Sequence, residues 1–440
     1  GKATGLCEGK GGSMHVTDRS LGVLGANGIV GAGYLLAMGA AFTIKHEGRK
    51  DVSVVFAGDG SVNQGMFHEA MNMASLFELP LLVVVENNLY GEFTALEKHS
   101  AELNLHKRLN AYRIPACQLD GNDAGELFGK MADTINQIRQ DGRPRMVELM
   151  TYRHHGHMEG ESVLYRSLGE KETHLKRDPI LLHQRRLLDQ KLATEQEIKD
   201  LENQVRHSVE EAVTYAIASP QPELIDLTTR VYFPDNASLF DGEIAGNAAG
   251  SDLSVAQAIN QAISEEMKRD PRVFLWGEDV ALGGYFSVTE GLADEFGQER
   301  IIDTPISEYG IVGGAVGAAM TGMRPICEIL FSDFLTCCMD PIFNQAAKLR
   351  YMTGGQVSIP LTVRTPVGAG VGMAAQHSQS MERFFFGVPG LMVVAPSDPY
   401  TAKGLLKSAI RSENPEIFFE HKLLYASGGI VPDTEYLLPL

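Results

Sequence analysis

The sequence predicts an α/β protein that contains two doubly wound parallel-sheet modules. Residues 28–150 alternate helical patterns with short runs of Val, Ile and Leu, and a second series of the same kind begins at Leu253. Apolar strands separated by helices are typical of parallel sheets whose two faces are both covered. In addition, the letters GIVG stand at the head of a small-residue helical pattern in both series, at Gly28 and at Gly310.

This repeated motif favours two related modules. The alternative is that small residues simply allow helices to pack closely on a sheet, because a four-letter match is a weak signal by itself. The similar position of the two copies within their series makes the duplicated module the better interpretation.

In the first series the expected elements follow one another in chain order. A small-residue helix runs from Gly28 and ends at Gly48, since glycine commonly terminates helices. The remaining elements are a strand with its turn over 51–60, a helix over 65–78, strands over 79–88 and 143–153, and a charged, solvated helical hairpin over 171–218.

The second series starts after a stretch that is rich in Pro, Gly, Asn and Asp and has no hydrophobic period, which predicts a linker. We therefore divide the chain into a first module over 1–233, a linker over 234–251 and a second module over 252–440. The second module should contain a helix over 255–269 and strands over 272–279, 300–305, 325–334, 359–366 and 391–397.

Composition excludes several classes of protein. The formal charge of −18 makes binding to nucleic acid or to anionic membranes unfavourable. The five cysteines lack paired C-x-x-C spacing, which argues against zinc and against a secreted disulfide framework. No apolar run reaches about 18 residues, and we expect no signal peptide. We expect a cytoplasmic protein.

The strongest chemical signal is a carboxylate between two glycines. Asp59 follows the first strand in the letters GDG, and Asn88 follows the next strand, 29 positions later. Ligands of doubly wound sheets bind at the carboxyl ends of strands, so we expect both side chains at one edge. Glycines let the backbone approach a ligand closely, and the start of a helix favours the binding of phosphate groups. Carboxylate and amide oxygens are suitable ligands for Mg²⁺. A tight turn followed by a helix cap is the weaker alternative.

This pattern resembles the thiamin diphosphate signature. The motifs GKGGSMH, GANGIVG, NQGMFHEA and YRHHGH are similar to the alpha subunit of the first component, E1, of 2-oxo acid dehydrogenase complexes of the pyruvate, acetoin and branched-chain type. In the second half, DPRVFLWGEDV, RIIDTPISEYGIVGG, NQAAKLRYMTGG, AAQHSQS and PGLMVVAPS are similar to the beta subunit. The subunits are usually separate chains, and here they are fused. The resemblance implies a transketolase-like fold.

The resemblance also implies the cofactors and their contacts. It implies thiamin diphosphate and Mg²⁺, with Asp59, Asn88 and the backbone carbonyl of Tyr90 on the metal. Leu330 and Phe334 are cofactor contacts by this resemblance, although plain core positions remain an alternative for both. The full set of implied cofactor contacts is Gly28, Val30, Asp59, Gly60, Ser61, Asn88, Ile306, Leu330 and Phe334.

Four residues match the family's catalytic groups. Glu308, in TPISEYG, matches the glutamate that shares a proton with the cofactor's pyrimidine ring; the alternative is an exposed residue at a helix start. Histidine can deliver protons near neutral pH. The resemblance assigns His157 and His377 to the substrate side, with His155 as an additional candidate, while His154 is interpreted as a packing residue.

Three departures from the family qualify this assignment. The aromatic–Arg pair that grips the diphosphate, and the C-terminal domain of the beta subunit, have no counterpart in the sequence, so we expect a piece of a longer protein. Met158 stands where mitochondrial relatives carry a phosphorylatable serine, so kinase control there is not expected.

The predicted function is oxidative decarboxylation of a 2-oxo acid, or cleavage of acetoin, with acyl transfer to a lipoyl group on a partner acyltransferase. The fused full-length chain is expected to form a homodimer. Two alternatives are a ketol transfer like that of transketolase and a non-catalytic assembly subunit. Magnesium-dependent binding of thiamin diphosphate separates the enzymes from the assembly subunit.

Overall fold

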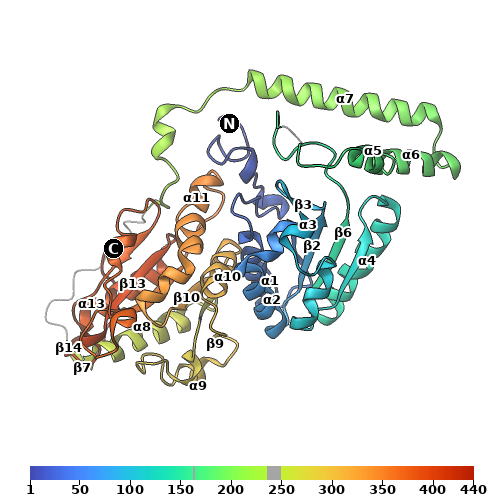
Figure 1. Cartoon of the computed structure of the whole chain (residues 1–440). Helices are drawn as coiled ribbons and strands as arrows, with labels where there is room; N and C mark the ends of the chain where they lie inside the picture. Colours follow the sequence, from blue (N-terminus) through green and yellow to red (C-terminus); the bar gives the residue numbers. More distant parts are fainter. Residues whose placement is uncertain (162–163, 235–248) are drawn as a thin grey trace. The chain divides into compact units, whose positions relative to one another are not determined.

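A computed structural model of the chain describes residues 1–161, 164–234 and 249–440, and it divides into two compact units. One is the 44–221 unit, which also includes residues 2–4, and the other is the 222–440 unit, which also includes residue 1 and residues 5–43. Each unit is built around one parallel sheet (Figure 1), which confirms the predicted fold class. The predicted linker over 234–251 lies almost entirely outside the described residues, and the predicted module boundaries stay a prediction.

The 44–221 unit contains a four-stranded parallel sheet. The strand order is β1 (Ser53–Gly58), β2 (Leu81–Asn87), β6 (Arg145–Met150) and β5 (Ala116–Asp120). Helix α4 (Ala124–Asp141) covers the sheet, because Ile138 joins the buried side chains of Leu82, Val84 and Val147. Helix α2 (Gly65–Leu76) follows the turn after β1. Strand β1 pairs directly with β2, so the turns that follow them meet at one edge.

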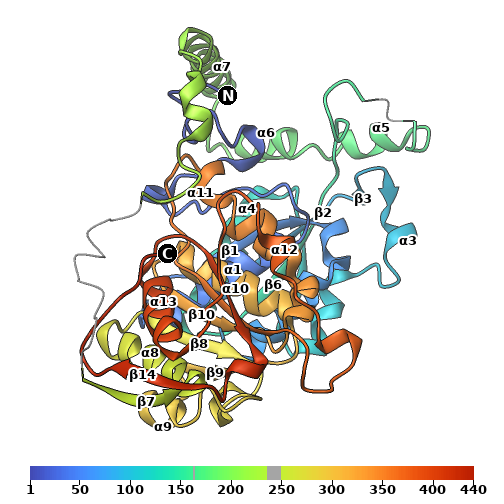
Figure 2. The same ribbon diagram turned by 90° about the vertical axis from the view of Figure 1, so that its left-hand side faces the viewer.

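An exposed helical arm ends this unit, as the charged segment predicts. It consists of α5 (Glu170–Leu175), α6 (Pro179–Asp189) and α7 (Glu195–Ala218). Figures 1 and 2 show α7 as a long helix that runs beside α6, and a hydrogen bond from Gln184 Nε2 to Glu202 Oε1 (2.7 Å) joins the two. No side chain of α7 is buried, so the arm is solvated.

The 222–440 unit contains a six-stranded parallel sheet. The predicted helix is present as α8 (Val255–Arg269), which packs against α13 (Pro399–Arg411). A short antiparallel pair, β7 (Gly250–Ser254) and β14 (Gly428–Pro432), lies outside the main sheet. The strand order of the main sheet is β12 (Met392–Val394), β13 (Glu416–His421), β11 (Thr362–Val367), β10 (Arg324–Glu328), β8 (Val273–Gly277) and β9 (Ile301–Asp303).

The order of strands in this sheet reverses next to β8. The chain passes from β8 to β9 on one side and then returns to β10 on the other side. In doubly wound sheets, ligands bind beyond the carboxyl ends of the strands at such a reversal. The loops after β8, β9 and β10 are therefore the place to look for a site.

Two helices that carry glycine approach each other backbone to backbone. They are α10 (Glu308–Met320) and the part of α1 (Ala32–His46) that belongs to the 222–440 unit, residues 32–43. A Cβ atom on Gly39 would lie 1.9 Å from the Gly314 carbonyl oxygen, and one on Gly317 would lie 2.2 Å from the Leu36 carbonyl oxygen. Only glycine permits this approach. As a result the segment 5–43, which comes first in the chain, packs with the second half.

The two GIVG copies adopt different structures. In α10 the letters lie inside the helix and are buried. The first copy precedes its helix, which starts at Ala32 and not at Gly28 as predicted, because Gly31 has a positive φ of 98° and the Ile29 N–H is bound by the Asn27 side chain (2.9 Å). Residues of this loop are exposed, and Val30 is 55% exposed.

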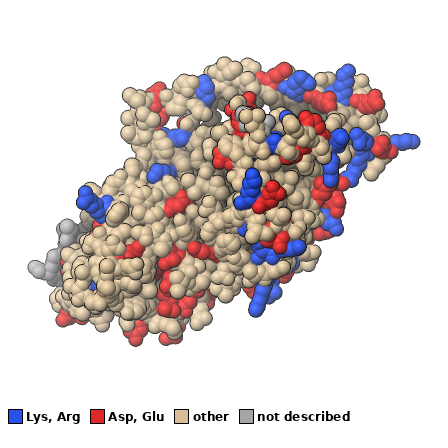
Figure 3. Space-filling model, viewed as in Figure 1, with Lys and Arg blue, Asp and Glu red and all other residues tan. Residues whose placement is uncertain are grey.

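None of the described helices is long and apolar enough to cross a membrane. On the face that Figure 3 shows, basic and acidic side chains are interspersed among the described residues, and no broad area is uniformly basic. This distribution agrees with the formal charge of −18.

Candidate functional site

Asp59 and Asn88 come together as the sequence predicts. Asp59 follows β1, its side chain is 1% exposed, and its Oδ1 accepts a hydrogen bond from the Asn88 backbone N–H (3.3 Å). The Asn88 side-chain oxygen in turn accepts from the backbone N–H of Tyr90 (3.2 Å). A carboxylate, an amide oxygen and the backbone of Tyr90 therefore gather at the carboxyl ends of two neighbouring parallel strands.

The turn that carries Asp59 lies close to a second segment, and glycines make this possible. The first is the 3-10 turn η3 (Asp59–Asn63), and the second segment is the short strand β3 (Tyr90–Gly91). A Cβ atom on Gly60 would lie 3.1 Å from the Cα atom of Gly91. Ser61 is buried and donates a hydrogen bond to the Gly58 carbonyl oxygen (2.5 Å). Gly60 and Ser61 thus lie in the same turn as Asp59, and their contact with a cofactor stays a prediction.

The donor set of this cluster fits a hard cation. Burial raises the pKa of Asp59, and the Asn88 N–H and His99 oppose that rise only in part. A buried carboxylate of this kind gains from a nearby positive charge. The described residues contain no group of three or more His, Cys, Asp or Glu that could hold a metal. A cation here would thus depend on Asp59, on amide and backbone oxygens and on ligand phosphate, which suits Mg²⁺.

The loop after β6 brings two of the predicted histidines to the same edge. His157 lies beside the ring of Phe93, with 6.4 Å between the ring centroids, and Phe93 follows β3. Arg153, on the same loop, donates to the Glu92 carbonyl oxygen (2.5 Å) and so joins the two loops. His155 and His157 are both exposed, while His154 is partly buried beside the Tyr152 ring, as its predicted packing role requires.

The 222–440 unit presents a second strand-end cluster, which consists of carboxyl groups. Glu308 is the first residue of α10, and Glu278 follows β8 directly. Burial raises the pKa of Glu278 to about 7, and the negative charges of Glu308, Asp279 and Glu328 add to that rise. Burial and the neighbouring negative charges therefore make Glu278 retain a proton more readily than a solvated carboxyl group would.

A buried ion network lies behind this cluster. Arg364 on β11 is 1% exposed and donates to Glu328 on β10 (2.8 Å) and to Glu420 on β13 (2.7 Å). The Tyr425 hydroxyl also donates to Glu420 (2.7 Å). One guanidinium thus serves two buried carboxylates. Burial still raises the pKa of Glu328, although the charge of Arg364 opposes that rise.

His377 is held against two aromatic rings. Its ring centroid lies 4.7 Å from that of Phe331 and 5.2 Å from that of Phe334. Its backbone carbonyl accepts a hydrogen bond from the Lys422 ammonium. Phe334 belongs to η8 (Ser332–Cys338), which contacts α10, the helix that begins with Glu308. Leu330 and Phe334 are both partly buried, so neither is a fully buried core residue.

The other predicted cofactor contacts of this unit lie in exposed loops. Gly28 is exposed, and a Cβ atom on it would lie 3.2 Å from the Met14 methyl group. Asn27, next to it, donates to the Gln345 side chain (2.6 Å) of the second half. Ile306 is 80% exposed and lies two residues before Glu308. The structure gives Val30 and Ile306 open surroundings and no contact that defines a role.

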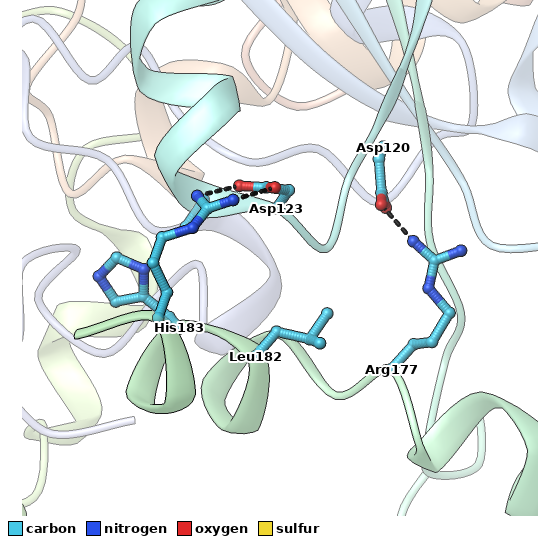
Figure 4. Close-up of a pocket in the computed structure, with 7 residues that line it drawn as sticks. Asp120, Asp123, Arg177, Leu182 and His183 are labelled. Carbon is cyan, nitrogen blue, oxygen red and sulfur yellow. Dashed lines mark hydrogen bonds and ion pairs between the residues drawn. The ribbon is translucent and has the colours of Figure 1, made fainter. Parts of the chain in front are cut away.

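A separate hollow of about 230 Å³ lies in the 44–221 unit, away from the predicted residues. Figure 4 shows that its aspartate and arginine side chains pair with one another. Arg186 forms two hydrogen bonds of 2.5 Å to Asp123, and Arg177 binds Asp120. The first pair joins α6 to the start of α4, so we interpret the hollow as structural.

Two residues near these clusters escaped prediction. Glu278 stands in GED, directly after an apolar strand, and this position was the available signal. His99, at the end of α3 (Leu96–His99), places Nε2 3.1 Å from Asp59 Oδ2, although 40 positions separate the two residues. No local pattern connects them.

Comparisons with known proteins identify the family of the chain. The family model described as "Dehydrogenase E1 component" matches residues 1–225, and that described as "Transketolase, pyrimidine binding domain" matches residues 251–427. The first match covers more than half of the chain. The chain therefore belongs to the dehydrogenase E1 component family, and the two matches together imply thiamin diphosphate as its cofactor.

Individual relatives include both kinds of subunit. In Bacillus subtilis, the beta subunit of acetoin:2,6-dichlorophenolindophenol oxidoreductase is 49% identical over 201 residues (43% of this chain, 59% of the relative). The alpha subunit of that oxidoreductase is 44% identical over 233 residues (53% and 69%). The 2-oxoisovalerate dehydrogenase subunit beta is 51% identical over 190 residues (43% and 58%). The resemblance to fused alpha and beta subunits is confirmed, and the chain spans under two thirds of these beta relatives.

Proposed function

We propose that the full-length protein is a thiamin diphosphate-dependent dehydrogenase E1 component. It would decarboxylate a 2-oxo acid, or cleave acetoin, and transfer the acyl group to a lipoyl group on a partner acyltransferase. The observation that carries the proposal is the buried Asp59 carboxylate against the Asn88 backbone, at the strand ends of a chain in the E1 family.

The first cluster would hold the diphosphate end of the cofactor. Asp59, the Asn88 side-chain oxygen and the Tyr90 carbonyl would bind Mg²⁺, and Gly60 and Ser61 would contact the diphosphate. Thiamin diphosphate, when bound, supplies the carbon nucleophile and the electron sink that decarboxylation requires.

The second cluster would handle protons. Glu308 would hold a proton toward the pyrimidine ring of the cofactor. Glu278, with a pKa near 7, would keep the pair from carrying two full negative charges at neutral pH. His377, with His157 and His155 from the other unit, would exchange protons with the substrate, because imidazole can do so near neutral pH. Phe334 and Leu330 would contact the cofactor from this side.

For the substrate we propose only a class of compound, namely a 2-oxo acid or acetoin. The beta relatives named for acetoin and for 2-oxoisovalerate match at 49% and 51% identity, so identity does not separate a 2-oxo acid from acetoin. Mass spectrometry of lipoyl products, with the full-length enzyme and a panel of 2-oxo acids and acetoin, should detect one dominant acyl group. If the cofactor binds but no acyl-lipoyl product forms, a ketol transfer becomes the better account; if the cofactor does not bind, the chain is an assembly subunit.

We also propose that the fused chain works as a homodimer in which each site draws on both units. Asp59 and His157 belong to the 44–221 unit, while Glu308 and His377 belong to the 222–440 unit. Those units can come from one chain or from two. Mixing full-length Asp59→Ala and Glu308→Gln proteins distinguishes the cases: activity returns if sites form across chains and stays absent if they form within a chain. A full-length protein that is monomeric and fully active would contradict the homodimer.

A further inference from the structure

The side chain that lies against the buried carboxylate is His99, and neither the motifs nor the family assignment account for it. Its Nε2 lies 3.1 Å from Asp59 Oδ2, the carboxylate oxygen that the Asn88 N–H does not bind. The His99 side chain is 14% exposed and that of Asp59 is 1% exposed. A Cβ atom on Gly91 would lie 3.4 Å from His99 Nε2, so the glycine turn leaves little room beside the ring.

The other ring nitrogen of His99 faces groups that can donate. Asn63 Nδ2 lies 3.1 Å from His99 Nδ1, and the Ser100 hydroxyl oxygen lies 3.0 Å from it. Asn63 belongs to the same turn as Asp59. The oxygen of the Asn63 amide can only accept a hydrogen bond and the nitrogen can only donate one. The orientation of this amide therefore decides whether His99 Nδ1 donates or accepts.

Arg108 decides the orientation of that amide. Its Nη1 donates to Asn63 Oδ1 (2.9 Å) and to the Val62 carbonyl oxygen (3.2 Å), and a guanidinium can only donate. The Asn63 oxygen therefore faces Arg108, and its NH₂ group faces His99 Nδ1 and the Gly60 carbonyl oxygen (3.5 Å). Nδ1 of His99 must then accept, which leaves the ring proton on Nε2, pointing at Asp59.

We propose that Arg108, Asn63 and His99 form a relay that positions the Asp59 carboxylate for a divalent cation. The relay sets the His99 tautomer, and the Nε2–H holds Oδ2 while the Asn88 N–H holds Oδ1. The plane of the carboxylate is thereby fixed, and the remaining lone pairs are directed to the cation. Outer partners of this kind commonly orient metal-binding side chains. The inference rests on the proposed role of Asp59 as a magnesium ligand.

His99 acts in this account as a positioning residue and not as a ligand. An imidazole that bound the cation itself would present a lone pair at Nε2, which would require the ring proton on Nδ1. The NH₂ group of Asn63 occupies that side. The arrangement therefore favours a site made of oxygen ligands only.

Calorimetric titration of the full chain with thiamin diphosphate and Mg²⁺ tests the relay. His99→Leu should weaken magnesium-dependent binding about 10- to 100-fold, the usual loss when an outer partner is removed. His99→Gln should recover part of that loss, because its amide N–H can still donate to Asp59. His207→Leu, on exposed helix α7, is the matched control and should bind like the wild type. Circular dichroism checks that each variant is folded.

Asp59→Ala, titrated in parallel, separates the two claims. If binding does not need Asp59, the proposed function itself is wrong. If binding needs Asp59 but His99→Leu binds like the wild type, only the relay is wrong. ¹⁵N spectra of the wild-type protein, labelled at histidine and without cofactor, test the relay without any substitution. The Nε2–H tautomer of His99 would support the relay, and the Nδ1–H tautomer would overturn it.

Discussion

The two strand-end clusters place carboxyl groups at similar points of two parallel sheets but surround them with opposite partners. Asp59 faces hydrogen-bond donors, namely the Asn88 N–H and the His99 ring. Glu278 faces other carboxyl groups, those of Glu308, Asp279 and Glu328. Both are desolvated, and burial is the largest cause of the raised pKa in each case.

The partners decide what each carboxyl group can do. Donors stabilise the charged form, so Asp59 is prepared to attract a cation. Like charges favour the protonated form, so Glu278 is prepared to hold a proton near neutral pH. In the proposed function, the first cluster would hold a metal-bound diphosphate and the second would serve proton transfer, and thiamin diphosphate needs both.

Of the substitutions that test this comparison, Asp59→Ala should have the largest effect, and it should act on cofactor affinity. Loss of the carboxylate removes a cation ligand, so magnesium-dependent affinity for thiamin diphosphate should fall by more than about 100-fold, the upper end of the loss for an outer partner. Calorimetric titration of the full chain measures it. Unchanged affinity would mean that the hydrogen-bond donors around Asp59 only stabilise the fold and do not prepare a cation site.

Glu308→Gln should leave cofactor affinity nearly unchanged and lower turnover strongly. The amide keeps the shape of the side chain but has no proton to share, and each tenfold loss in rate corresponds to about 1.4 kcal/mol of barrier. Hydrogen–deuterium exchange at the reactive carbon of bound thiamin diphosphate should slow in parallel with turnover. Normal exchange with slow turnover would assign Glu308 to a later step.

Glu278→Gln should have the smallest effect. This effect is a change in melting temperature, and its size should depend on pH. The folded protein holds a proton on Glu278 up to a pH of about 7, whereas the unfolded chain releases it at lower pH. Stability contributed by this group therefore falls as pH rises from about 4.5 to about 7 and stays low above that range. The variant, which never ionises, should melt on the order of 2 °C above the wild type at pH 8 and equally at about pH 4.

Thermal melting across this pH range measures the effect, and Glu211→Gln on exposed helix α7 is the control. A difference in melting temperature that does not vary with pH would show that Glu278 is not held in its protonated form by its neighbours.

The fold was predictable wherever strands are uniformly apolar. All strands expected from Val, Ile and Leu runs are present, and α8 spans the expected residues, Val255–Arg269. Strand β5 was missed because its sequence, ACQLD, is polar and half exposed. Strand β13 was missed because it carries Glu416 and Glu420, and Glu420 is tolerated in the core only through Arg364 on the neighbouring strand.

The candidate site was predictable where motifs are local. Asp59 and Asn88 follow strands that proved to be neighbours, so their proximity could be inferred from the order of elements. The family resemblance supplied Glu308, His157 and His377, whose roles remain proposals. His99 and Arg108 could not be predicted, because their link to Asp59 depends on how loops fold back across the edge of the sheet.

The central claim is that the donor-lined carboxylate binds a cation which in turn holds a diphosphate. Titration of the wild-type full chain with thiamin diphosphate, in Mg²⁺ and again in excess EDTA, tests this claim most directly. We expect saturable binding in Mg²⁺ and its loss in EDTA, with recovery when Mg²⁺ is restored. Binding of equal affinity in EDTA, or no binding in either condition, would contradict the account.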